Sequence, residues 1–262
     1  MALDVRNLKI SLFSGEMIVN DVSFEISHGQ MLSLVGGSGA GKTTVCRAVM
    51  GLLSDNYIIE GSINFGGRDL RKLNKKQLSG IYGKEICFIM QNPMTAFNPS
   101  IRIGKQLERS YLRHHLKAEK KETRKRYETI LNGLGLDDTE RILNNYPFEL
   151  SGGMLQRIMI AAAIIQEPKL LVADEATTAI DACNRMELMQ QMKKLCGQGM
   201  SVLFVTHDLK AASVSDWMMI MNHGKIVETG QTDMVMNSPE NEFTKELVNA
   251  CELRRDAYDR AK

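Results

Sequence analysis

The sequence predicts an α/β fold in which a mostly parallel sheet is interrupted by an inserted helical subdomain. Short apolar runs bounded by Gly, Pro, Asn or Asp recur along the chain, at Met31–Val35, Ile86–Met90, Leu170–Ala173 and Val202–Val205. Such runs are typical of strands buried on both faces, as in a parallel sheet with helical crossovers. Residues 93–166 carry no strand pattern. We therefore expect a sheet whose strands come from both sides of a helical insertion.

Composition supports a folded protein with a core. The chain has 262 residues, of which 44% are hydrophobic and 24% charged, and its formal net charge is +2. This charge gives no electrostatic reason to expect nucleic acid as the main partner. Five cysteines without a C-x-x-C pair favour a reducing compartment over a disulfide framework.

The N-terminus lacks the basic-then-apolar layout of a signal peptide. The longest purely apolar run, Ile158–Ile165, is far below the roughly 18 residues that span a bilayer. We expect a cytosolic protein whose membrane role, if any, comes through a partner.

The sequence predicts two hairpins. Ser62–Phe65 precedes the turn Gly66-Gly67, and Trp217–Met221 is joined to Lys225–Glu228 by a short Asn-His-Gly link. A third region, Lys117–Arg126, is a run of basic residues that alternate with two glutamates. This run indicates either a contact with an anionic surface or, the interpretation we favour, the solvated face of an exposed helix.

A glycine-rich loop lies between the run Met31–Val35 and an expected helix at Lys42–Leu52. It matches G-x-x-x-x-G-K-[ST] in the strand-to-helix context that this phosphate-binding motif requires. Glycines let backbone N–H groups converge on phosphate oxygens, and the helix N-terminus adds partial positive charge. We expect Lys42 to reach the β- and γ-phosphates of a nucleoside triphosphate and the Thr43 hydroxyl to bind Mg²⁺. The candidate nucleotide-binding residues are Gly36, Gly37, Ser38, Gly39, Ala40, Gly41, Lys42, Thr43 and Thr44.

Acidic and imidazole side chains follow two other expected strands. Asp174 ends one apolar run, where it can organise the Mg²⁺ shell, and Glu175 follows it as the candidate to polarise an attacking water. His207 follows Val202–Val205 and could donate a hydrogen bond to the γ-phosphate, although a structural role is a common alternative. Because ligands bind at the carboxyl ends of parallel strands, we expect these groups to meet at one edge of the sheet.

The segment Leu150-Ser151-Gly152-Gly153-Met154, together with the phosphate loop, resembles the signature of the ATP-binding cassette (ABC) family. Ser151 is expected to cap a helix, and Gly152 and Gly153 expose backbone N–H groups. The resemblance implies a P-loop NTPase core with an N-terminal antiparallel β subdomain and an inserted helical signature subdomain. It also implies a head-to-tail dimer in which each signature covers the ATP of the opposite subunit.

Other family elements occur in the same order. Gln91 is similar to the family's glutamine loop, which senses Mg²⁺ and the membrane partner, and His207 to its switch histidine. Residues 179–181, including Asp181, resemble the dimer-contacting D-loop. Phe13, before the first hairpin, matches the position where the family stacks an aromatic ring on adenine, but it could equally be a core residue. The departures are Met154 for the signature glutamine and Ala176 and Ile180 for the commoner Pro and Leu.

By the same resemblance, the chain divides at 1–92 and 167–235 for the ATP-binding core, 93–166 for the helical insertion and 236–262 for a short C-terminal tail. Residues 91–99 and 149–157 are similar to the peptide/nickel importer ATPases, although Leu155 departs from their usual Arg. The tail lacks the clustered cysteines of peptide-transporting members, which favours a nickel or metal-chelate importer, with peptides as the alternative. His114 and His115 are expected to be exposed helical neighbours rather than a nickel site.

This resemblance implies ATP and Mg²⁺ as cofactors and a place on the cytoplasmic face of the membrane. The partners it implies are permease subunits in the membrane, a second, different ATPase subunit and, indirectly, an extracellular solute-binding protein. Two alternatives come from other classes: a soluble ABC protein acting on ribosomes or DNA, and a regulator that binds ATP without turnover. The single short cassette disfavours the first, and Glu175 with His207 disfavours the second.

Overall fold

The computed structural model describes residues 1–177 and 182–260, and within them the strands form two sheets. One is antiparallel, in the order β2-β1-β4-β5, and the other has the order β10-β9-β3-β8-β7-β6. The antiparallel strands are β1 (Leu3–Leu12), β2 (Met17–Ile26), β4 (Tyr57–Phe65) and β5 (Arg68–Asp69). The second sheet comprises β3 (Met31–Gly36), β6 (Ile86–Ile89), β7 (Leu170–Asp174), β8 (Ser201–Thr206), β9 (Trp217–Asn222) and β10 (Lys225–Gln231).

The central strands are parallel, as the four apolar runs predict. β3 pairs in parallel with β8 and β9, and β7 pairs in parallel with β6 and β8. Alternate residues of each strand face two different hydrophobic clusters: Leu171 and Ala173 lie in one, Leu170 and Val172 in the other. Burial on both faces explains why these strands read as continuous apolar runs. Among the described strands of this sheet, only β10, at one edge, is antiparallel to its neighbour β9.

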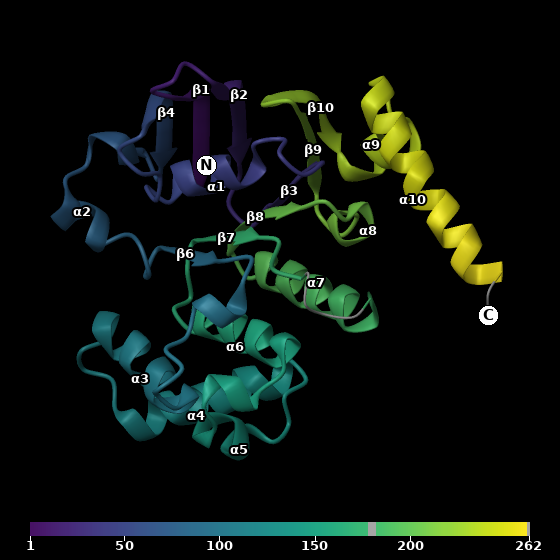
Figure 1. Ribbon diagram of the computed structural model, residues 1–262. Coiled ribbons are helices and arrows are strands. Elements are labelled where there is room, and N and C mark those ends of the chain that lie inside the picture. The colour runs from purple at the N-terminus through teal and green to yellow at the C-terminus, as the bar shows by residue number, and fades with distance from the viewer. Residues whose placement is uncertain (178–181, 261–262) are drawn as a thin grey trace.

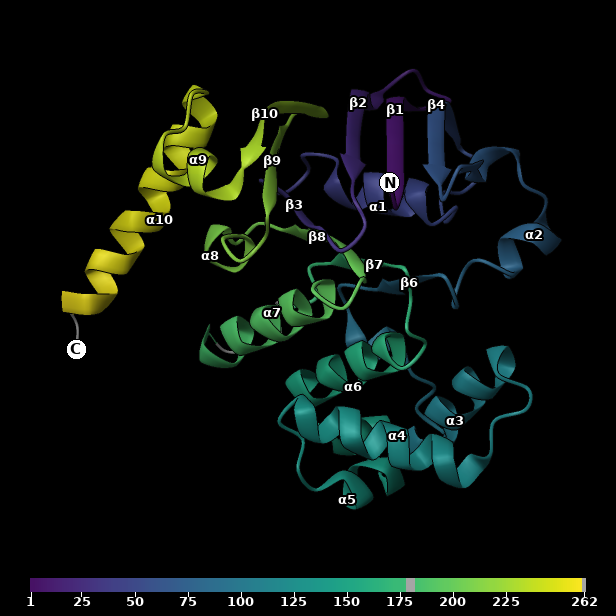
Figure 2. The ribbon, with the colours of Figure 1, turned by 180° about the vertical axis from the view of Figure 1, so that it is seen from behind.

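Helices cover both faces of the six-stranded sheet and so divide the core into layers (Figure 1). Helix α1 (Lys42–Val49) lies between the antiparallel sheet and the six-stranded sheet and shares a hydrophobic cluster with both. Helices α6 (Gly152–Ile164) and α7 (Ala182–Cys196) cover the opposite face of the six-stranded sheet. Figure 2 shows the same order of layers from behind. Helix α1 is three residues shorter than expected, because Met50 caps it and Gly51 then takes a left-handed conformation with φ 62°.

The insertion between β6 and β7 is helical, as predicted. Tyr127 and Leu131 of its central helix are buried against neighbouring helices of the insertion. It contains α3 (Ile103–His114), α4 (Lys120–Gly133), α5 (Thr139–Asn144), α6, and 3₁₀ turns at Pro93–Thr95 and Pro147–Glu149.

The expectation that His114 and His115 are exposed is wrong. Both side chains are half-buried, and the ring of His115 stacks on that of Tyr111 with centroids 4.1 Å apart. Burial also lowers the pKa of His114, and neighbouring Arg113 adds to this shift. The two histidines therefore belong to the packing at the end of α3.

The remaining helices lie at the periphery of the core. Val248 and Val235 join Val35 and Ile220 of the sheet in a third hydrophobic cluster, so the C-terminal segment packs on the core. These helices are α2 (Lys75–Ser79), α8 (Leu209–Ala212), α9 (Thr232–Asn237) and α10 (Glu242–Arg260), with a 3₁₀ turn at Leu70–Lys72. Within the described residues, no helix is both long and apolar enough to cross a membrane.

Candidate active site

The phosphate-loop motif forms a turn between β3 and α1 whose base is tightly packed. Gly41 caps α1 with φ 102°, and a Cβ there would lie 2.9 Å from the carbonyl oxygen of Ile18. A Cβ at Gly36 would lie 2.2 Å from the carbonyl oxygen of Met221. At Gly37 and Gly39, by contrast, an added Cβ would meet no atom within 4 Å. The glycines thus hold the loop close to the core on one side and leave its rim open on the other.

Lys42 is the buried cation of this loop. Its Nζ donates hydrogen bonds to the carbonyl oxygens of Gly36, over 2.9 Å, and Gly37, over 2.8 Å. Burial lowers the pKa of Lys42, while the nearby carboxylates of Glu175 and Asp174 act in the opposite direction. A cation held in this position is ready to meet phosphate oxygens at the rim of the loop.

A hydroxyl and a carboxylate meet between α1 and β7. The Oγ1 of Thr43 donates to Oδ1 of Asp174 over 3.2 Å, and Asp174 is only 3% exposed. Burial raises the pKa of Asp174, and the hydrogen bond from Thr43 offsets part of that rise. Hydroxyl and carboxylate oxygens are the hard ligands that Mg²⁺ prefers, so this pair fits the predicted metal position.

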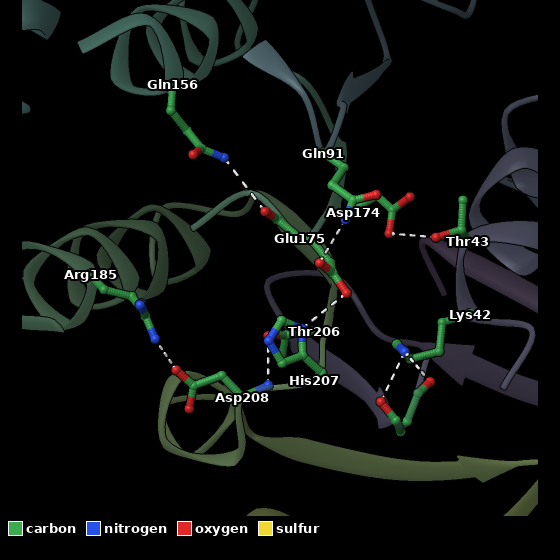
Figure 3. A network of polar contacts seen from close by, with 12 residues as sticks. Lys42, Thr43, Gln91, Gln156, Asp174, Glu175, Arg185, Thr206, His207 and Asp208 are labelled. Atoms are coloured by element: carbon green, nitrogen blue, oxygen red, sulfur yellow. Dashed lines mark hydrogen bonds and ion pairs between the residues drawn. The ribbon is translucent and has the colours of Figure 1, made fainter. Parts of the chain in front are cut away.

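Glu175 is the centre of the polar network (Figure 3). Its Oε2 accepts a hydrogen bond from Nε2 of Gln91 over 2.9 Å, and its Oε1 lies 3.1 Å from Nδ1 of His207. The three residues follow β6, β7 and β8, which are neighbours in the sheet. The carboxyl ends of these parallel strands therefore bring the three side chains together, as the strand-end argument predicts for Glu175 and His207.

The backbone of Glu175 adopts a conformation that is uncommon for a residue with a side chain. Its φ is 48°, and its N–H donates to the carbonyl oxygen of Val205 over 2.8 Å. From the other side, Nε2 of Gln156 reaches the carbonyl oxygen of Glu175 at 3.5 Å (Figure 3). A left-handed residue persists only where its surroundings hold it, and such strain clusters at functional sites.

The sequence did not lead us to Gln156, which lies in α6 and is fully buried. A signal was present, because Gln156 is a polar residue on the buried side of a helix that is otherwise strongly apolar, and such a residue needs a polar partner. The sequence gives no prediction for Arg185 either. Its side chain forms an ion pair with Asp208, the residue after His207, and the Asp208 side chain caps α8. Arg185 thereby ties α7 to the turn that carries the histidine.

The signature residues lie apart from the phosphate loop of the same chain. Ser151 caps α6 by accepting a hydrogen bond from the N–H of Met154 over 3.2 Å, as expected. Gly152 and Gly153 form the first turn of helix α6, which covers the face of the six-stranded sheet opposite α1 (Figure 1). In the described part of the chain, no hydrogen bond joins Ser151, Gly152 or Gly153 to residues 36–44.

Phe13 and Asp181 are the two remaining residues that were predicted to contact nucleotide. Phe13 lies within the turn between β1 and β2 rather than before that hairpin, and it is 70% exposed, so it is not a core residue. Its role as an adenine-stacking residue stays a prediction. Asp181 lies outside the described residues.

Comparison with known proteins identifies the family. Residues 19–178 match the family model described as ABC transporter. The chain is 39% identical to the oligopeptide transport ATP-binding protein OppD of Bacillus subtilis, over 94% of this chain and 70% of that protein. It is 35% identical to the metal-staphylopine import system ATP-binding protein CntD of Staphylococcus aureus, over 98% of this chain and 95% of that protein.

Among solved structures, a dimeric ATP-binding cassette bound to ADP and Pi superposes with a TM-score of 0.79. Its sequence is 27% identical, and the match covers 88% of this chain and 98% of that one. The predicted α/β fold with an antiparallel N-terminal sheet and a helical insertion is thus confirmed. The chain belongs to the ABC transporter family of ATP-binding proteins.

Proposed function

We propose that this protein is the ATP-hydrolysing subunit of a membrane importer for small peptides or metal chelates. The observation that carries the proposal is the position of Glu175, held by Gln91 and His207 beside the Thr43–Asp174 pair at the end of the parallel strands. Lys42 and the open rim of the glycine loop supply the adjoining phosphate site. These groups lie together at one edge of the sheet, which supports a role in nucleotide hydrolysis.

In this proposal each residue of the site has its own role. Lys42 and the loop N–H groups bind the β- and γ-phosphates, and the Glu175 carboxylate accepts a proton from the attacking water. His207 and Gln91 orient that carboxylate, and His207 can donate to the γ-phosphate. Thr43, Asp174 and Gln91 would hold Mg²⁺, which when bound neutralises charge on the phosphate oxygens.

We further propose that two cassettes act head to tail. Because Ser151, Gly152 and Gly153 lie away from the phosphate loop of their own chain, they are available to the nucleotide of a second cassette. The helix N-terminus behind Ser151 gives these residues the partial positive charge that a phosphate group needs. The solved cassette that resembles this chain is itself a dimer bound to ADP and Pi. The second cassette would be a different but homologous subunit.

The solute class is proposed from the relatives. Their names include oligopeptide and dipeptide transport proteins and a metal-staphylopine import protein. Short peptides and metal chelates are both small polar solutes, and neither would contact this chain. We place the protein at the cytoplasmic face of the membrane, held there by permease subunits and served indirectly by an extracellular solute-binding protein.

Affinity purification from the native host tests this assignment. The tagged chain, isolated from gently solubilised membranes, should bring with it two permease subunits, a second ATPase and a solute-binding protein. The ligand carried by that binding protein would then decide between peptide and metal chelate. Recovery of ribosomal or DNA-associated proteins with no membrane subunit would overturn the importer assignment and leave only the ATPase.

A further inference from the structure

A cavity of about 500 Å³ lies in the helical insertion, between α3, α4 and the C-terminal end of α5 with the segment that follows it. None of the candidate nucleotide-site residues lines it. Tyr127, Thr123 and Leu143 are buried side chains of its wall. The hydroxyl of Tyr127 donates to the carbonyl oxygen of Leu107, which fixes part of that wall. The cavity is therefore a built feature of the insertion, separate from the phosphate loop.

The lining of this cavity is strongly basic. The five cationic residues that line it outnumber the one acid, Glu108, and the whole chain carries a net charge of only +2. Along each helix successive cations are spaced three or four residues apart, so they share a face. They are Arg102, Lys105 and Arg109 at the start of α3 and along it, and Lys120 and Arg124 on α4.

Among the described residues, the nearby acids pair with only two of these five cations. Glu108 pairs with Lys120 at 3.1 Å, and Arg124 pairs with Glu128, which lies outside the lining. Lys105 and Arg109 form no ion pair with any residue in the described part of the chain. Like charges brought together around one cavity repel each other unless an anion joins them.

We propose that this basic cavity binds an anion that carries at least two phosphate charges. Arginine presents a planar fork of donors that matches phosphate oxygens, and lysine adds a mobile point charge. The phosphate group could belong to a soluble molecule or to the headgroup of an anionic lipid, because both present the same chemistry to Arg109 and Lys105. The proposal does not rest on the transport assignment.

The test measures anion binding to a protein whose phosphate loop has been weakened by Lys42→Ala. The soluble arm uses inorganic pyrophosphate and isothermal titration calorimetry. The lipid arm uses co-sedimentation with vesicles of phosphatidylcholine and cardiolipin, whose headgroup carries two phosphate groups, against vesicles of phosphatidylcholine alone. Both arms compare the parent with Lys105→Glu/Arg109→Glu and with a matched control on the same insertion.

The control is Lys121→Glu/Lys125→Glu, which changes the net charge by the same amount. Both lysines are exposed on α4, and neither lines the cavity. We expect the cavity variant to bind at least about tenfold more weakly in one arm or both, and the control to stay within about threefold of the parent. Loss in the pyrophosphate arm identifies a soluble anion, and loss in the vesicle arm identifies a lipid headgroup.

Two results would overturn the proposal. One is that the parent binds neither probe, and the other is that both charge-reversal pairs lose binding equally, which would indicate only a general charge effect. Far-UV circular dichroism checks that each variant folds. Should Lys105→Glu/Arg109→Glu fail to fold, the milder pair Lys105→Gln/Arg109→Gln takes its place and must show the same selective loss.

Discussion

The side-chain amide of Gln91 donates to Oε2 of Glu175 over 2.9 Å, although the two residues are 84 positions apart in the chain. They are brought together because β6 and β7 are parallel neighbours whose carboxyl ends share an edge. His207 binds the other carboxylate oxygen from β8. One carboxylate is thus oriented from both flanking strands, and any movement of Gln91 must change how Glu175 is held.

Replacement of this carboxylate is the sharpest test of its role. Glu175→Gln preserves shape but cannot accept a proton, so we expect ATP turnover to fall at least about tenfold while ATP binding persists. The dimer with bound nucleotide should accumulate, which size-exclusion chromatography can detect. Glu242→Gln removes an exposed carboxylate far from the phosphate loop in sequence and should leave turnover unchanged. Turnover near the wild-type rate in Glu175→Gln would remove this residue from its assigned role.

Lys42 supplies the buried cation of the phosphate loop. Lys42→Ala removes a charge-assisted contact to phosphate, so we expect nucleotide binding to be lost or weakened by about two orders of magnitude. Fluorescence titration with a labelled nucleotide measures this directly. Lys72→Ala removes a lysine whose side chain is 84% exposed, and this control variant should bind nucleotide with the wild-type affinity. Full affinity in Lys42→Ala would show that the phosphate site lies elsewhere.

Asp174 is a buried carboxyl whose charge costs stability in the nucleotide-free protein. Its pKa in the folded state is raised above the ordinary value of 3.8, chiefly by burial, so ionisation disfavours the folded state as the pH rises. We therefore expect Asp174→Asn to have the higher Tm at about pH 8 and to lose this advantage as the pH falls towards about pH 4. Differential scanning calorimetry across this pH range, without nucleotide, measures the difference in Tm between Asp174→Asn and the wild-type protein. A difference that stayed constant or grew at low pH would contradict the prediction.

Gln156 positions the backbone of Glu175 from within the signature helix. Gln156→Leu removes the donor to the Glu175 carbonyl, so we expect kcat to fall about tenfold while the Kd for ATP changes less than threefold. Gln166→Leu is the matched control, because Gln166 is also buried and its side-chain atoms form no hydrogen bond with any described residue. An equal fall in kcat for both variants would reduce the effect to general packing.

The sequence predicts most of this site because its groups are attached to strand ends. The phosphate loop, Asp174 and His207 each follow a recognisable apolar run, and parallel pairing then brings them together without further information. Gln156 escaped prediction because its partner is a backbone carbonyl in another element, and no local pattern encodes that contact. The burial of His115 depends likewise on stacking with Tyr111, four residues earlier, in a helix whose exposed face could not be assigned from spacing alone.

The order of strands in the six-stranded sheet also bears on how the chain folds during synthesis. The antiparallel pairs among β1, β2 and β4 are complete within the first 65 residues, so this sheet can close early. Strand β3 has to wait for β8 and β9, whose residues begin at Ser201 and Trp217. Contacts so distant in sequence are slow to form, because a long loop must close, at a cost in chain entropy, before the contacts stabilise the fold. The strand that carries the phosphate loop therefore gains both of its neighbours only after β8 and β9 have been synthesised. We expect that a nascent chain cannot hold nucleotide until most of it has left the ribosome.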